Sequence, residues 1–284
     1  MKRPPVSDRS VLITGCSSGI GKSTAALLKA EGWKVYAAAR KDADLEMLSA
    51  EGYTPIQLDV SSESSIQTAA KAVLHDNDGK LGGLVNNAGL GITGAMEDLS
   101  WNAMSMQMNV NTIGMQLLSN QFIPAFRQAG NGRIVNISSV LGRVSIPFAG
   151  MYCASKFAME AMSDAMRMEV RAAGIGVSLI EPGPIQSQFR PNAAALINEH
   201  VDTSNSAFKD YYASHVENRL LKNHDDQPFM LPPEAVAKKI RHALVSGNPR
   251  RRYCVTVPAY GGAWLRRLAP YSVLDWLCGR RLNS

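Results

Sequence analysis

Short, mostly β-branched hydrophobic runs alternate with longer amphipathic stretches along most of this 284-residue chain. The short runs predict strands at residues 11–13, 33–39, 55–58, 84–85, 133–138, 176–181 and 253–257. Apolar residues at helical spacing predict helices near 20–31, 63–74, 101–128, 152–172 and 233–245. Strands that are apolar throughout and separated by helices are typical of a parallel sheet covered on both faces. The pattern therefore predicts an α/β fold, a doubly wound parallel sheet of about seven strands.

One segment interrupts this alternation. Residues 187–232 are polar and helix-like, and they end at Pro232-Pro233, where the next helix is expected to begin. A connection of this length usually has a function, so we predict that 187–232 forms a substrate lid. Since no internal repeat and no Gly/Ser-rich linker divides the chain, we expect one domain over residues 1–284.

The composition narrows the class of protein. A chain with 45% hydrophobic and 19% charged residues is neither low-complexity nor a coiled coil. Its four cysteines show neither metal-ligand spacing nor a disulfide framework, so no metal site is expected. The start of the chain has no apolar signal-peptide region, and no run reaches the roughly 18 uncharged apolar residues of a membrane span. These features predict a cytoplasmic protein.

The charge is concentrated near the end of the chain. Residues 248–284 carry seven arginines and one acidic residue, Asp275, and therefore account for the whole net charge of +6. Trp264, Tyr271, Trp276 and several leucines lie between the arginines. A helix packed on its own domain, with its arginines in water, is the favoured interpretation of this basic C-terminal segment. Contact with a membrane surface or a partner stays open. Nucleic-acid binding is not expected, because the rest of the chain is close to neutral.

A glycine-rich turn follows the first predicted strand. The run 14–21 reads Thr-Gly-Cys-Ser-Ser-Gly-Ile-Gly and opens the first predicted helix. Gly15 permits the turn, Gly19 lets the backbone approach a pyrophosphate, and Gly21 allows the helix to pack closely on the strand. The helix N-terminus adds N–H groups and a positive dipole. The turn predicts a dinucleotide site, although three glycines alone are weak evidence.

The end of the second predicted strand bears on which nucleotide binds. An acidic residue there would bind a free ribose hydroxyl and repel a 2′-phosphate. This chain instead has Arg40 and Lys41, and its first acid is Asp42. Because arginine binds phosphate through charge-assisted hydrogen bonds, we predict NADP rather than NAD. An ordinary solvated Arg-Lys pair is the alternative.

Further polar residues follow the later strands. Asp59 ends the third predicted strand, Asn87 follows the fourth, and Ser139 follows the fifth. Ligands bind at the carboxyl ends of strands in open α/β sheets, so Asp59 is expected to accept from an adenine amino group. Taken singly, such residues are usually helix caps or turns. Ser138 competes with Ser139 for contact with a substrate oxygen.

Tyr152 and Lys156 are spaced to share one face of a predicted helix. A tyrosine phenol ordinarily titrates near pH 10, and a neighbouring ammonium favours the phenolate. The pair therefore predicts a general acid/base, although the Y-x-x-x-K spacing alone arises by chance about 0.3 times in such a chain.

Taken together, these motifs resemble those of the short-chain dehydrogenase/reductase family, in order along nearly the whole chain. The resemblance rests on T-G-x-x-x-G-x-G at 14–21, Asp59, N-N-A-G at 86–89, Asn111, Ser139, the pair Tyr152 and Lys156, and Pro182-Gly183. It implies a Rossmann fold and a catalytic tetrad of Asn111, Ser139, Tyr152 and Lys156. Tyr152 would be the acid/base, Ser139 would orient the carbonyl, Lys156 would bind the nicotinamide ribose, and Asn111 would hold a relay water. Asn109 is close by, but Asn111 keeps the family's N-x-x-G spacing.

The residues expected to bind NADP extend this set along the carboxyl edge of the sheet. They are Gly15, Ser17, Ser18, Gly19, Ile20, Gly21, Arg40, Lys41, Asp59, Val60, Asn87, Ala88, Gly89, Tyr152, Lys156, Pro182, Gly183, Ile185 and Ser187.

Within the family, the chain is similar to the 17β-hydroxysteroid and retinol dehydrogenase-like branch, and to bacterial members described as NADP-dependent aldehyde reductases. The implied substrate is an apolar aldehyde or ketone, or the corresponding alcohol. A hydroxysteroid or retinoid is the second possibility, and a nucleotide-binding regulator without turnover is a third. The expected pocket residues are mostly apolar: Ile146, Pro147, Phe148, Met151, Phe189, Leu196 and Ile197. Methionine stripes on 104–115 and 159–166, together with the resemblance, lead us to expect a dimer or a higher homo-oligomer.

Overall fold

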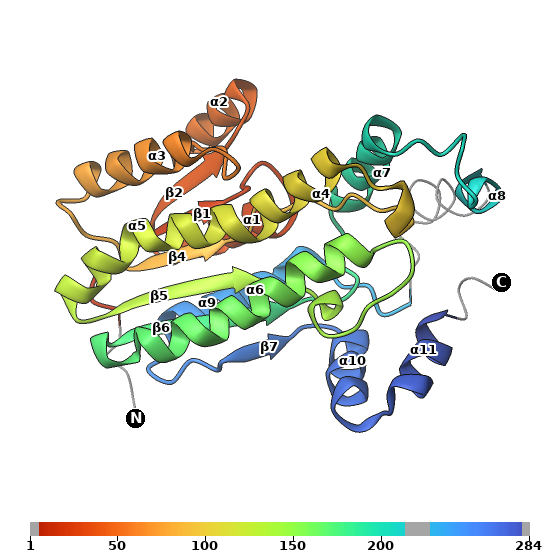
Figure 1. Cartoon of the computed structure of the whole chain (residues 1–284). Helices are drawn as coiled ribbons and strands as arrows, with labels where there is room; N and C mark the ends of the chain where they lie inside the picture. The colour runs from red at the N-terminus through yellow and green to blue at the C-terminus, as the bar shows by residue number, and fades with distance from the viewer. Residues whose placement is uncertain (1–5, 214–227, 280–284) are drawn as a thin grey trace.

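The computed structural model describes residues 6–213 and 228–279. Within them, seven parallel strands form one sheet in the order β3-β2-β1-β4-β5-β6-β7 (Figure 1). The strands are β1 (Ser10–Thr14), β2 (Lys34–Ala39), β3 (Thr54–Gln57), β4 (Gly83–Asn86), β5 (Gly132–Ile137), β6 (Ile175–Glu181) and β7 (Arg252–Cys254). The predicted doubly wound sheet is confirmed. Strand order reverses between β1 and β4, the position at which ligands bind in such sheets.

Helices cover both faces of the sheet (Figure 1). One hydrophobic cluster includes Val73, Phe122 and Met166, from the helices α3 (Glu63–Asp76), α5 (Gly114–Ala129) and α6 (Gly150–Glu169). The second includes Leu28 and Ile240, from α1 (Gly19–Ala30) and α9 (Pro233–Val245). Both clusters contain strand residues, because consecutive side chains of a strand point to opposite faces. This is why the strands read as continuous apolar runs.

The predicted helix over 101–128 is interrupted. The chain forms α4 (Trp101–Met108), a π-helical turn η2 (Asn109–Ile113) and then α5. Gly114 begins α5 against the Val60 carbonyl oxygen, which a Cβ at this position would overlap. Single π turns inside helices often mark functional sites, and this one contains Asn111.

Two helical regions differ from the sequence prediction. Helix α2 (Asp42–Ala50) was not predicted, because its apolar face is short and Leu48 is its one buried residue. At the other end, the strand predicted over 253–257 stops at Cys254, and α10 (Val257–Leu268) and α11 (Tyr271–Gly279) follow. Pro258 in the first turn of α10 favours a helix start over a continued strand. Within 6–213 and 228–279, every helix is too short or too polar to cross a membrane.

The segment predicted as a lid contains α7 (Phe189–His200) and α8 (Lys209–Tyr211), which lie beyond the ends of the strands (Figure 1). It is anchored by an antiparallel bridge between Leu99 and Val201 and a parallel bridge between Ile185 and Leu231. Residues 214–227 of the predicted lid, and Arg280 and Arg281 of the basic C-terminal segment, lie outside the described residues.

Candidate active site

The glycine turn after β1 has the backbone that a dinucleotide site needs. Gly15 and Gly19 have φ angles of +71° and +54°, a region that favours glycine. A Cβ at Gly21 would overlap the Gly15 carbonyl oxygen, so α1 packs against the turn only with glycine there. The first turn of α1 has no acidic residue, and its N-cap Ser18 makes no side-chain capping bond. The N–H groups of this helix end therefore suit an anionic pyrophosphate.

Thr14 and Asn87 hold this turn against the loop after β4. The Thr14 hydroxyl accepts hydrogen bonds from the backbone N–H groups of Asn87 and Ala88, at 2.9 and 2.8 Å. Asn87 Nδ2 donates to the carbonyl oxygens of Thr14 and Gly15. Thr14 was not among the predicted site residues. Its position at the end of β1 could have indicated a place in the site. In the structure, its hydroxyl positions the loop after β4 against the glycine turn.

The predicted adenosine end is open and cationic. Arg40 and Lys41 are exposed after β2, and Asp42 accepts a 3.1 Å hydrogen bond from Gln57. Asp59 accepts from the N–H and the hydroxyl of Ser61, at 2.8 and 2.6 Å. Asp59 thus forms a turn and is not the helix cap that the sequence offered as the alternative, because Ser62 caps α3. Its contact with an adenine amino group stays a prediction.

Tyr152 and Ser139 meet at the carboxyl end of β5. Ser139 Oγ accepts a 3.1 Å hydrogen bond from the Leu141 N–H, and the Ser139 side chain lies near enough to Tyr152 to lower the pKa of its phenol. Burial raises the pKa of the Tyr152 phenol to about 12, against the lowering effect of Ser139. Ser138 is buried and lies toward Glu160 instead. Of the two candidate serines, Ser139 is the one that affects the pKa of the tyrosine.

Lys156 lies one helical turn beyond Tyr152. Its Nζ donates a 2.8 Å hydrogen bond to the Ile137 carbonyl and lies 5.8 Å from the centroid of the Tyr152 ring. Burial lowers the pKa of Lys156 to about 8, and the Glu160 carboxylate opposes this change. Because residue 89 is a glycine, no side chain occupies the space beside the ammonium. A Cβ at this position would lie 3.8 Å from Nζ.

The Asn111 side chain is fully buried and committed to protein partners. Its Oδ1 accepts from the Leu90 N–H at 2.9 Å, and its Nδ2 donates to the Leu90 carbonyl and the Ser155 hydroxyl. The amide therefore fixes the π turn to the loop after β4 and to α6. Its predicted role in holding a relay water stays a prediction.

The predicted nicotinamide side follows β6. The Pro182 carbonyl accepts from the Val140 N–H at 2.8 Å, which ties it to the loop that carries Ser139. A Cβ at Gly183 would overlap the hydroxyl of Thr256. Ile185 pairs with Leu231, and the Ser187 side chain faces Gly19 across the glycine turn. The structure thus brings this segment to the same edge as Tyr152 and the glycine turn.

Phe189, in the segment predicted as a lid, lies close to the tyrosine. The ring centroids of Phe189 and Tyr152 are 5.5 Å apart. Phe148, with φ of +61°, stacks on Tyr211 at 3.9 Å. Tyr212 donates to Asp98 at 2.7 Å and accepts from the Ala95 N–H, and so joins the segment predicted as a lid to the loop before α4. Sequence reasoning missed Asp98 and Tyr212, whose 114-residue separation gives no local signal.

Of the other predicted pocket residues, Leu196, Ile197 and Met151 belong to the same hydrophobic cluster as Phe148 and Tyr212. Ile146 and Pro147 are half-buried in the preceding loop. The predicted apolar lining is therefore largely assembled at one place.

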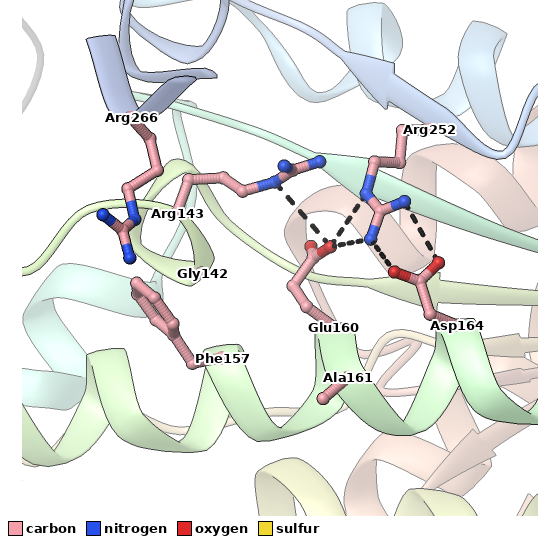
Figure 2. A pocket seen from close by; sticks show the side chains of 8 residues that line it. All are labelled: Gly142, Arg143, Phe157, Glu160, Ala161, Asp164, Arg252 and Arg266. Carbon is pink, nitrogen blue, oxygen red and sulfur yellow. Dashed lines mark hydrogen bonds and ion pairs between the residues drawn. The ribbon is translucent and has the colours of Figure 1, made fainter. Parts of the chain in front are cut away.

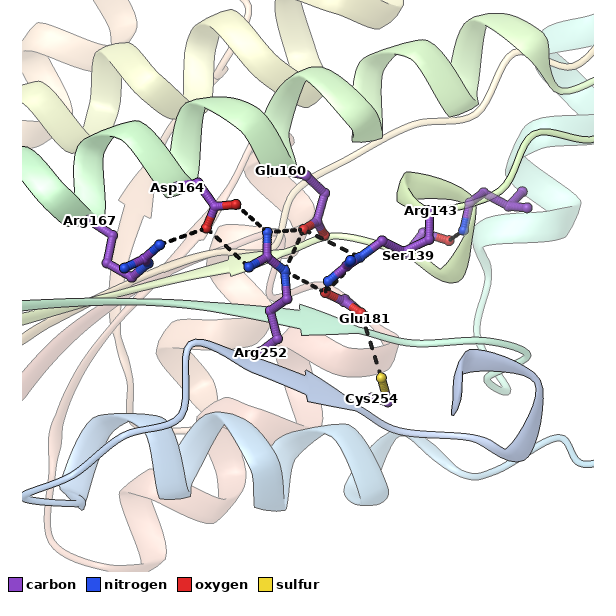
Figure 3. A network of polar contacts seen from close by, with 9 residues as sticks. Ser139, Arg143, Glu160, Asp164, Arg167, Glu181, Arg252 and Cys254 are labelled. Carbon is purple, nitrogen blue, oxygen red and sulfur yellow. Dashed lines mark hydrogen bonds and ion pairs between the residues drawn. The ribbon is translucent and has the colours of Figure 1, made fainter. Parts of the chain in front are cut away.

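A charged network lies beside this helix and was not predicted. Arg252 binds Asp164 at 2.5 Å, Glu160 at 3.1 Å and Glu181 at 3.1 Å, while Arg143 binds Glu181 at 2.8 Å (Figure 3). Burial, and then the neighbouring Glu181, raises the pKa of Glu160. The network borders a hollow of about 250 Å³ that Phe157 and Arg266 also line (Figure 2). The sequence could have indicated the two acids of α6, because Glu160 and Asp164 continue the four-residue spacing of Tyr152 and Lys156.

Comparison with known proteins decides the family. The short chain dehydrogenase family profile matches residues 9–196, more than half of the chain. The chain belongs to the short-chain dehydrogenase family. A short-chain dehydrogenase from Streptomyces avermitilis has the same fold, with a TM-score of 0.79 and 28% sequence identity. The superposition covers 98% of this chain and 99% of that chain.

Relatives within the short-chain dehydrogenase family include an uncharacterized oxidoreductase, YbbO, of Escherichia coli K12. It is 42% identical over 270 residues, which cover 95% of this chain and 94% of YbbO. Human retinol dehydrogenase 16 is 35% identical over 255 residues, 87% of this chain and 80% of that protein. These matches show an oxidoreductase that uses a nicotinamide cofactor and acts on CH–OH groups.

Proposed function

We propose that this short-chain dehydrogenase is an NADPH-dependent reductase of apolar aldehydes or ketones that also works in reverse as an alcohol dehydrogenase. The observation that carries the proposal is the position of Tyr152: its phenol lies beside Ser139, and its ring centroid is 5.5 Å from that of Phe189 in the predicted lid. A proton donor beside an apolar aromatic lid suits a carbonyl on an apolar chain. Arg190 lies next to Phe189 in the sequence, but the rest of the pocket offers mainly apolar contacts.

NADP as the cofactor is supported by the end of β2. Arg40 and Lys41 are exposed there, and the nearest acid, Asp42, hydrogen-bonds Gln57. Two cations without a competing carboxylate suit a 2′-phosphate, which needs positive partners. The glycine turn and the N-terminus of α1 would hold the pyrophosphate.

The chain's own residues support reduction as follows. When bound, the nicotinamide supplies the hydride. Ser139 and Tyr152 hydrogen-bond the substrate oxygen, and Tyr152 donates its proton to that oxygen as the alcohol forms. Because burial raises the pKa of Tyr152 to about 12, the phenol is protonated over the physiological range and is ready to donate. Lys156, fixed to the Ile137 carbonyl, places positive charge beside the phenol and stabilises the phenolate that remains.

A hydroxysteroid or retinoid substrate is the second candidate. The specific observation in its favour is the 35% identity to human retinol dehydrogenase 16. A nucleotide-binding regulator without turnover is disfavoured, because Ser139, Tyr152 and Lys156 lie together in a geometry that suits proton donation.

A nicotinamide absorbance assay tests the proposal. Purified enzyme is incubated with NADPH or NADH and with three sets of substrates: aliphatic and aromatic aldehydes, ketosteroids, and retinal. The proposal expects oxidation of NADPH with apolar aldehydes at a higher kcat/KM than with the other two sets. A preference for retinal or ketosteroids would favour the second candidate, and the absence of turnover with every substrate would favour the regulator.

We also propose that the protein forms a dimer or a higher homo-oligomer through α4, α5 and α6. The methionine stripes give limited support, since Met115, Met159 and Met166 are buried within the chain itself. Ile113, in η2 between α4 and α5, and Met168 on α6 are 45% and 64% exposed and would be covered by a second copy. Light scattering on wild type and on Met168→Glu tests this, and a wild-type monomer would contradict it.

A further inference from the structure

The two helices at the end of the described chain have an uncovered apolar face. On α10, Val257, Trp264 and Leu268 recur at helical spacing and are 62%, 62% and 72% exposed. On α11, Tyr271 and Trp276 are 68% and 55% exposed. We call this set the C-terminal apolar face. Large apolar residues exposed this close together mark an interaction surface more often than isolated ones do.

Packing on the rest of the protein accounts for few of these side chains. The buried residues of α10 are Ala259 and Gly262, and Leu274 is the one buried residue of α11. Gly262 lies close to Val140, so the small residues of α10 attach it to the loop after Ser139. The large residues point elsewhere. The predicted packing of a helix on its own domain is therefore made by the small side chains of α10, while Trp264 and Leu268 stay largely exposed.

Arginine is the main charged residue on the two helices that carry this face. Arg266 and Arg267 at the end of α10 are exposed, whereas the exposed Arg250 and Arg251 lie before β7, at the other end of that strand from α10. Asp275 is the one acid in the sequence from 248 to 284. Arg266 also donates to the Tyr271 hydroxyl at 3.0 Å and lies over its ring, which joins the two helices. The face thus combines tryptophan, tyrosine and leucine with arginine, the composition of segments that bind at a membrane interface.

Figure 1 shows where this face lies. Helices α10 and α11 project from the end of the molecule toward which the strands point, the end that also carries α7 and α8. Neither helix takes part in the layers that cover the sheet. A flat partner can therefore reach them without displacing another described element.

We propose that the C-terminal apolar face binds the surface of an anionic phospholipid bilayer. Trp264 and Leu268 enter the interfacial layer, and the arginines contact the lipid phosphates. The charge argues against a second copy of the chain as the occupant. A two-fold contact would place the same patch against itself, arginines facing arginines, with Asp275 as the one acid on each side. Anionic headgroups complement the charge instead.

Co-sedimentation of the full chain with vesicles tests this proposal. We expect binding to vesicles of phosphatidylglycerol and phosphatidylcholine, weaker binding at high salt, and little binding to phosphatidylcholine alone. Trp264→Ser combined with Leu268→Ser should abolish sedimentation. Arg267→Glu should weaken the partition coefficient at least fivefold, since each basic residue near an anionic surface contributes about that factor.

Matched controls separate this surface from general effects. Trp101→Ser removes a tryptophan that is 79% exposed on α4, and Lys238→Glu reverses an exposed charge on α9; both should sediment like wild type. All variants should keep their circular dichroism spectrum, because the altered side chains are exposed. Wild type that does not bind anionic vesicles would overturn the proposal. So would a Trp264→Ser, Leu268→Ser variant that binds vesicles normally but loses self-association by light scattering, which would assign the face to a second copy.

Discussion

Lys156 Nζ lies 5.8 Å from the centroid of the Tyr152 ring while it donates a 2.8 Å hydrogen bond to the Ile137 carbonyl. The ammonium is thus fixed beside the phenol by the backbone of β5. Burial acts on the two groups in opposite directions: it raises the pKa of Tyr152 and lowers that of Lys156. Each shift favours the neutral form, as burial does for any ionisable group.

The first prediction concerns pH. The pKa of Lys156 is about 8, so the lysine is charged below that pH and loses its charge as the pH rises through it. The phenol, with a pKa of about 12, stays protonated over the same range. We therefore expect kcat/KM for carbonyl reduction to be highest below pH 8 and to fall above it. A profile that stays level to pH 10 would show that the lysine charge does not affect the proton donor.

The second prediction concerns Glu160, which raises the pKa of Lys156 against the effect of burial. Glu160→Gln removes that negative charge, so the pKa of Lys156 should fall further. The descending limb of the kcat/KM profile should move to lower pH. Glu46→Gln, at an exposed position on α2, is the control and should leave the profile unchanged. If Glu160→Gln lowers the rate equally at every pH, its role is structural.

The third prediction concerns the stability of the charged network. Arg252→Met removes the closer of the two arginines that pair with both Glu160 and Glu181 and leaves only Arg143, 3.8 Å from Glu160, so the free energy of unfolding at neutral pH should fall by roughly 3 kcal/mol. The pKa of Glu160, already raised by burial, should rise further. A carboxyl with a raised folded-state pKa contributes stability below its unfolded value, near 4.5, and loses it as the pH rises. Denaturant unfolding should therefore show a smaller deficit at pH 5 than at pH 8; an equal deficit would contradict the charge explanation.

The fourth prediction concerns cofactor choice. Arg40→Ala should lower kcat/KM for NADPH about tenfold to a hundredfold, the range of one charge-assisted hydrogen bond, and leave NADH nearly unchanged. Lys41 should limit the loss. Adding Ala39→Asp should repel the 2′-phosphate and invert the preference. Arg127→Ala, an exposed arginine on α5, is the control. Wild type that prefers NADH, or an equal loss with both cofactors, would show that Arg40 is an ordinary solvated charge.

The sequence predicted the parts of the site that follow from strand order. Gly15, Asp59, Asn87 and Ser139 each follow a predicted strand, and parallel strands end at one edge of the sheet. Periodicity could not show the π turn at Asn111, because it depends on the close approach of Gly114 to Val60, which is distant in the sequence. The contact of Asp98 with Tyr212 likewise joins two loops that no spacing relates.

The C-terminal segment shows a different limit. Its composition suggested two outcomes, a helix packed on its domain and a helix docked elsewhere, and both use the same apolar residues. The end of β7 at Cys254 determines where α10 begins. The small residues Ala259 and Gly262 then pack α10 on the rest of the protein, and together these two features decide which of its side chains are covered. Such placement depends on tertiary contacts and cannot be read from the residue pattern.

The proton-donor role of Tyr152 is the central claim. The most direct measurement is the single-turnover rate of NADPH oxidation with an apolar aldehyde, for wild type and Tyr152→Phe, together with NADPH affinity from fluorescence. Phenylalanine keeps the ring beside Phe189 and removes the hydroxyl. We predict unchanged NADPH affinity and a rate lower by about 10²–10⁴, the usual contribution of a positioned acid. A rate within tenfold of wild type at equal NADPH occupancy would contradict the assignment.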